Sequence, residues 1–137
     1  MIQFAAQSET TGEVAPLLRP VTCRELIVYA RAVDYFGRGQ SAETLQALAW
    51  VLLNRRRSVG DESAYARPMP GYLGEYDQVD AHLARGLGAM AQALSPGATD
   101  PTCGSTRFHH HHECPGWAAH MQLQAIAGSY LFYSQKF

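Results

Sequence analysis

The run His109-His110-His111-His112-Glu113 is the densest group of side chains in this sequence that could do chemistry. Imidazole and carboxylate groups bind zinc or nickel, and His109 and His111 would share a face if the segment were extended. No helical His-x-x-x-His and no Cys-x-x-Cys pair accompanies the run. We therefore interpret it as a polar loop that adheres to immobilised metal and predict no metal ligands. A small metal-binding protein is kept as an alternative hypothesis.

Aromatic side chains gather in the last third of the sequence, at Phe108, Trp117, Tyr130 and Tyr133. The apolar faces of hexose rings pack on aromatic rings, so these side chains could form the wall of a sugar-binding site. Four aromatic residues are equally typical of the core of a domain of this size. Asn54, at the end of a predicted helix, either hydrogen-bonds that helix end or contacts a substrate amide.

Composition indicates one globular domain. The chain has 137 residues, 47% of them apolar and 17% charged, with a formal net charge of −1. This balance gives no one-sided basic field for nucleic acid, and no apolar run reaches the roughly 20 residues that span a bilayer. The first 20 residues do not read as a secretory signal. Three cysteines favour free thiols in a protein made in the cytoplasm, with a Cys103–Cys114 disulfide as the less favoured alternative.

Three helices are predicted. Thr22 is an N-cap for a helix over 23–36, with Glu25 completing a capping box. Ser41 begins a second helix that ends near Arg57 and buries Leu45, Leu48, Ala49, Leu52 and Leu53. Residues 79–94 return to helical spacing.

The remaining segments have other patterns. Residues 1–21 are interpreted as a flexible or docking arm and 58–78 as a long functional loop, while 22–137 form the domain. Residues 105–109 and 129–133 are predicted strands, and 117–127 a further helix.

Six short motifs occur in one order along the chain. They are Arg38-Gly39, Leu53-Asn54-Arg55, Asp100-Pro101-Thr102 with Gly104-Ser105-Thr106, Phe108-His109, Pro115-Gly116-Trp117 and the segment Ile126 to Tyr133. In this order and spacing they resemble the spore cortex-lytic (SleB-like) cell wall hydrolases over roughly residues 23–133. The resemblance implies an α+β, mainly α, lysozyme-like domain with a small antiparallel β element near its C-terminus. It also implies Asn54, Phe108, His109, Trp117 and Tyr130 as substrate-binding residues.

The catalytic position of this family is occupied differently here. The ungapped comparison puts Phe36 where the family has its catalytic glutamate, and an alternative alignment puts Arg31 there; Gln40 replaces a second glutamate. Proton transfer to a glycosidic oxygen needs a carboxylic acid. The candidates are Asp34, two residues from the ungapped position, and Glu43, which matches a family glutamate that is not the proton donor.

The resemblance leads to two hypotheses. The first is cleavage of peptidoglycan between N-acetylmuramic acid and N-acetylglucosamine, by hydrolysis or lytic transglycosylation, with no cofactor. The second is an inactive member of the same fold that binds peptidoglycan or serves as a structural component of a phage-like particle. In both, the expected partners are peptidoglycan and particle or tail proteins, at the cell wall, in the periplasm or within a virion-like particle.

Overall fold

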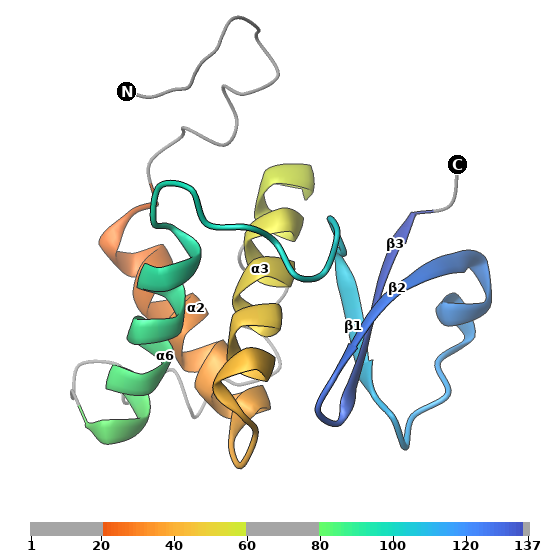
Figure 1. Ribbon diagram of the computed structural model, residues 1–137, viewed down its shortest axis with the longest axis horizontal. Helices are drawn as coiled ribbons and strands as arrows, with labels where there is room; N and C mark the ends of the chain where they lie inside the picture. The colour runs from red at the N-terminus through yellow and green to blue at the C-terminus, as the bar shows by residue number, and fades with distance from the viewer. Residues whose placement is uncertain (1–20, 60–79, 136–137) are drawn as a thin grey trace, which may run out of the picture.

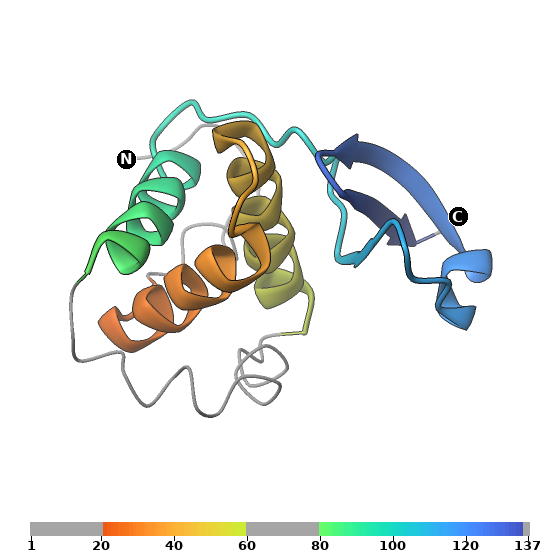
Figure 2. The ribbon, with the colours of Figure 1, turned by 90° about the horizontal axis from the view of Figure 1, so that it is seen from below.

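The computed structural model describes residues 21–59 and 80–135. Within these residues, three helices lie together at one end, and a three-stranded antiparallel sheet lies at the other (Figure 1; Figure 2). The predicted fold class, a mainly helical α+β domain with its β element near the C-terminus, is confirmed. The predicted arm (1–21) and the predicted loop (58–78) fall almost entirely outside the described residues.

Helix α2 (Cys23–Gly37) begins as the sequence predicts. The Thr22 side chain accepts a hydrogen bond from the Glu25 amide (3.1 Å), and the Glu25 carboxylate accepts one from the Thr22 amide (3.0 Å), which together form the capping box. Val28, Ala32 and Val33 are buried in the core. The helix ends where Arg38 takes an extended conformation.

Helix α3 (Ala42–Val59) supplies the centre of the core. The Ser41 hydroxyl accepts a hydrogen bond from the Thr44 amide (3.3 Å), as expected of an N-cap. Leu45, Leu48 and Leu52 are buried, so the apolar face predicted from their spacing is confirmed.

Helix α6 (Ala81–Ala93) closes the helical layer. The Asp80 carboxylate caps it by accepting a hydrogen bond from the Leu83 amide at 2.8 Å. Gly86 lies so close to α2 that a Cβ atom built on it would be 2.0 Å from the Ala30 carbonyl oxygen. The absence of a side chain at Gly86 therefore sets the distance between α2 and α6.

The sheet has the order β1-β3-β2, with both pairs antiparallel. Its strands are β1 (Arg107–His110), β2 (Met121–Ala127) and β3 (Tyr130–Gln135). Phe108 pairs with Phe132, and Ala127 pairs with Tyr130 across the turn at Gly128. The two predicted strands are confirmed as β1 and β3.

The predicted helix over 117–127 is wrong. Residues Gly116–His120 form one 3₁₀ turn, and the rest of the segment is strand β2. Met121, Gln122, Leu123 and Ala125 are good helix formers, but they pair with residues of β3, and this long-range pairing outweighs local propensity.

Glu25 joins the first two helices. Its carboxylate accepts hydrogen bonds from the Arg56 guanidinium at 2.7 and 3.0 Å, and its side chain is only 16% exposed. This pairing with Arg56, assisted by Thr22, lowers the pKa of Glu25 from 4.5 to about 2 although burial opposes the shift.

The lowered pKa makes a pH-dependent contribution to stability. The contribution is fully present above pH 4.5 and is lost as the pH falls through about 2, because the unfolded chain binds the proton more tightly. We expect Glu25→Gln to lower the free energy of unfolding by about 2–3 kcal/mol at pH 7, with little difference from wild type near pH 2. Urea denaturation across this range measures the effect. Glu43→Gln, an exposed first-turn change, is the control, and a Glu25 effect that did not vary with pH would contradict the assignment.

Two further sequence expectations concern cysteines and membranes. Cys23, Cys103 and Cys114 are exposed free thiols, as predicted. Among the described residues, none of the helices has the length and hydropathy required to cross a bilayer.

Candidate functional site

A hollow of ≈ 440 Å³ opens beside the sheet, within the size range of ligand pockets. We call it the aromatic hollow. It is lined by Phe108, His109, Glu113, Cys114, Pro115 and Trp117. Three of the predicted substrate-binding residues thus lie together. Glu113 and Cys114 were not predicted as site residues.

His109 is held in one orientation at the side of the aromatic hollow. It is 8% exposed, and its Nδ1 lies 2.7 Å from the His110 carbonyl oxygen. A carbonyl oxygen only accepts, so Nδ1 carries the proton and Nε2 accepts a hydrogen bond from the Tyr133 hydroxyl at 2.9 Å. The ring stacks on Tyr133 with centroids 5.2 Å apart. With both nitrogens engaged, His109 presents its ring to a ligand as a surface.

Trp117 lies between two hollows. It lines the aromatic hollow and also a neighbouring one of ≈ 350 Å³ that includes Arg55, Arg107 and His120. The Arg107 guanidinium lies 5.2 Å from the centre of the indole ring, and Tyr133 meets the ring edge-on at 5.4 Å. A fixed, half-buried indole shared by two hollows can contact successive units of an extended ligand.

Phe36 is the residue that the ungapped comparison puts in the place of the family's catalytic glutamate. Its ring packs edge-on against Phe108 with centroids 5.1 Å apart, and its carbonyl oxygen accepts a hydrogen bond from the Tyr130 hydroxyl at 2.6 Å. Burial, and then the charge of Glu113, raises the pKa of Tyr130. Tyr130 therefore holds β3 against the end of α2.

Gln40 serves a related structural purpose. Its side-chain amide donates to the Ser129 hydroxyl at 3.2 Å and accepts from the Ser129 amide at 3.1 Å. Gly128, with φ of +56°, leaves room for this contact, because a Cβ there would lie 2.3 Å from the Gln40 oxygen. The glutamine at the second motif position thus docks the β2–β3 turn on the helical layer.

Asp34 lies inside the helical layer. It is 0% exposed, and its carboxylate pairs with Arg38, the residue that follows α2, and lies 3.4 Å from His82 Nδ1 on α6. It does not line the aromatic hollow. This position suits a residue that joins α2 to α6 better than one that meets a polymeric substrate.

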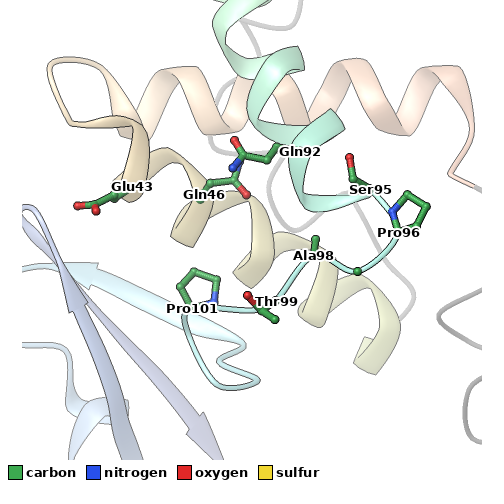
Figure 3. A pocket seen from close by; sticks show the side chains of 9 residues that line it. Glu43, Gln46, Gln92, Ser95, Pro96, Ala98, Thr99 and Pro101 are labelled. Carbon is green, nitrogen blue, oxygen red and sulfur yellow. The ribbon is translucent and has the colours of Figure 1, made fainter.

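Glu43 lines a different hollow, of ≈ 470 Å³, between α3 and the segment that follows α6 (Figure 3). Gln46, Gln92, Thr99 and Pro101 also line it, and none of the described residues around it is aromatic. Glu43 is exposed, in the first turn of α3. The structure therefore does not bring the two predicted acids, Asp34 and Glu43, into one site.

Asn54 is buried, and its side chain hydrogen-bonds to other parts of the protein. Its side-chain nitrogen donates to the Asp100 carboxylate (2.8 Å) and to the Ser105 carbonyl oxygen (3.0 Å). Asp100 also accepts hydrogen bonds from the Thr102 amide, the Thr102 hydroxyl and the Gly104 amide, at 2.7–2.8 Å. Both amide hydrogens of Asn54 therefore hold the turn that leads into β1.

The histidine run forms the turn after β1. The ring of His110 stacks on those of His111 and His112, which are tilted against each other, and the centroids of the three rings lie 3.9–4.9 Å apart. Loss of solvent around the ring, and then the neighbouring histidines, lowers the pKa of His111. Glu113 ends the run, and its carboxylate accepts a hydrogen bond from the His110 amide at 2.7 Å. This bond places Glu113 at the edge of the aromatic hollow.

The chain is similar in structure to the catalytic domain of the Bacillus cereus SleB protein. The TM-score is 0.68 at 18% sequence identity, over 85% of this chain and 94% of that chain. No protein-family model and no curated protein matches the sequence. At this identity the likeness shows the fold: this chain has a SleB-like, lysozyme-like architecture.

Proposed function

We propose that this protein binds the glycan strand of peptidoglycan in the aromatic hollow and cleaves it between N-acetylmuramic acid and N-acetylglucosamine. The fold it shares with a SleB catalytic domain supports peptidoglycan as the substrate class. The single observation that supports the site is that Phe108, Trp117 and Glu113 line the same hollow. Aromatic walls suit sugar faces, and a carboxyl group suits proton transfer.

Glu113 is the proton donor in this proposal. A glycan that fills the hollow excludes bulk water from the reacting groups. Glu113 then gives its proton to the glycosidic oxygen as the C1–O bond breaks. The resulting carboxylate takes a proton either from the muramic acid 6-hydroxyl, whose oxygen bonds to C1 to close an anhydro ring, or from a water that adds to C1.

Binding without cleavage is the second candidate function, and one observation favours it. In the ungapped comparison Phe36 takes the position of the family acid, and its ring packs against Phe108, so this position carries a phenyl ring and no carboxyl group. The aromatic walls for binding are unaffected by this change. Association with a phage-like particle, and the place where the protein acts, stay predictions from the sequence.

Incubation of the tag-free protein with insoluble peptidoglycan, followed by mass spectrometry of the supernatant, tests both candidates. We expect the wild type to release muropeptides and Glu113→Gln to release them at least about 100-fold more slowly while still sedimenting with the pellet. Glu43→Gln is the matched control and should behave as the wild type. Anhydro products would indicate transglycosylation and reducing ends hydrolysis.

Other outcomes of this assay have definite meanings. If Glu43→Gln stopped the release of muropeptides and Glu113→Gln did not, the proton donor would be Glu43, one of the two acids considered from the sequence. Retention of the wild type without release would leave the binding candidate, and Trp117→Ala should then weaken retention. A protein neither retained nor active would contradict both candidates.

A further inference from the structure

We propose that His110, His111 and His112 form a binding site for one divalent transition-metal ion, of which Zn²⁺ is the natural probe. One ligand nitrogen from each ring lies within 4.8 Å of the other two. Tetrahedral zinc holds imidazole nitrogens at 2.0–2.1 Å, which sets neighbouring nitrogens about 3.4 Å apart. Metal binding would close this difference by rotation of the three rings, which are half-buried or exposed.

The turn itself brings three consecutive side chains together. The His111 amide donates to the Ser129 carbonyl oxygen at 2.8 Å, and the Glu113 amide donates to the His110 carbonyl oxygen at 2.8 Å. The His110 amide donates in turn to Glu113. Three consecutive residues of a strand would alternate between faces, so this hydrogen-bonded turn creates the convergence, which reduces the ordering that an ion would have to impose.

The hydrogen bonds also leave nitrogens available to an ion. Nδ1 of His111 lies 3.3 Å from the Ser129 carbonyl oxygen and therefore carries the proton, so the lone pair is on Nε2. A carbonyl behind the distal nitrogen is the usual second support of a metal-bound histidine. Nδ1 of His110 accepts the His112 amide at a long 3.2 Å, a contact that a metal–nitrogen bond can replace. His109 takes no part, because Tyr133 and His110 engage both of its nitrogens.

An ion at this point would fix the loop that borders the aromatic hollow. The histidine turn contacts Ser129, and His110 meets Tyr130 edge-on at 5.5 Å. By fixing the three histidines, the ion would hold the segment that carries Glu113 against the β2–β3 turn. Three imidazoles leave a fourth position for water or another ligand. The site does not depend on glycan cleavage, since its ligands are distinct from the proposed acid.

Calorimetric titration of the metal-free, tag-free full chain with Zn²⁺ tests the proposal. We expect one ion per chain, a rise in Tm of roughly 5 °C or more at a hundredfold excess over Kd, and at least tenfold weaker binding in His110→Ala, His111→Ala and His112→Ala. His120→Ala, which removes an exposed histidine of the neighbouring 3₁₀ turn, should bind as the wild type does. Circular dichroism verifies that each variant is folded.

Two results would overturn the site. One is binding of several ions per chain, with no rise in Tm, as expected of a surface histidine run that only adheres to metal. The other is an affinity that His111→Ala and His120→Ala reduce equally. Both are independent of the peptidoglycan assay, so failure of one proposal leaves the other standing.

Discussion

Gly86→Ala is expected to lower the free energy of unfolding by about 3 kcal/mol or more, or to prevent folding. A Cβ atom at this position would lie 2.0 Å from the Ala30 carbonyl oxygen and 2.8 Å from the Ala30 carbonyl carbon. The neighbours are backbone atoms, which cannot rotate away as a side chain would. Helices α2 and α6 would have to separate along their contact, which exceeds the usual cost of overpacking. Thermal and urea denaturation measure the effect.

Gly88 provides the matched control on the same helix. A Cβ atom there has nothing within 4 Å, and the residue is exposed. Gly88→Ala should therefore stabilise the protein by up to about 1 kcal/mol through helix propensity alone. If both substitutions changed the free energy of unfolding by similar amounts, α2 and α6 would not approach each other as closely at Gly86 as described above.

Asp100→Ala is expected to cost about 3–5 kcal/mol of stability. The carboxylate accepts four hydrogen bonds, from the Thr102 amide and hydroxyl, the Gly104 amide and the Asn54 side chain. Removing the carboxylate leaves these donors without this acceptor, including the side-chain NH₂ group of the buried Asn54. Each unsatisfied donor costs about 1–3 kcal/mol before the surrounding structure relaxes. Denaturation with urea measures the change.

Two further variants sharpen this test. Asp100→Asn keeps the shape but turns its NH₂ group either toward the donors of Asn54 and Gly104 or toward those of Thr102. We therefore expect a loss intermediate between wild type and Asp100→Ala. Thr99→Ala, an exposed neighbour, should stay within about 0.5 kcal/mol of wild type. If Asp100→Ala lowered the free energy of unfolding only slightly, the hydrogen bonds of the Asp-Pro-Thr motif would not be what stabilises this turn.

Local chemistry made the helical layer predictable. Thr22 and Glu25 satisfy each other's backbone donors within four residues, and the spacing of Leu45, Leu48 and Leu52 already defines one face of a helix. Such signals need no knowledge of distant residues. The order and approximate bounds of all three helices followed from them.

Long-range pairing made β2 unpredictable. The segment Met121–Ala127 has the composition of a helix, and only its partner β3 reveals it as a strand. The same difficulty affected the site. Phe108, His109 and Trp117 were predicted because motifs mark them, whereas Glu113 carries no motif and reaches the hollow through a turn that no periodicity describes.

Buried polar residues were the hardest to interpret. Asp34 was a candidate proton donor, and Asn54 was either a substrate contact or a helix-end hydrogen-bonding residue; the structure surrounds both with protein. An acid or amide in a helix has the same appearance in sequence whether it faces a cleft or another helix. Only the partners, Arg38 and His82 for Asp34 and Asp100 for Asn54, distinguish the two cases.

The hydrogen bond from Tyr130 to Phe36 joins residues that are 94 positions apart, and that between Ser129 and Gln40 joins residues 89 apart. A growing chain therefore exposes the end of α2 long before its covering strand has been synthesised. The loop that these bonds close is long and entropically costly, so the sheet should join the helices late in folding. Until then Phe36 and its apolar surroundings are open to association with other chains. This exposure ends when β3 packs over them.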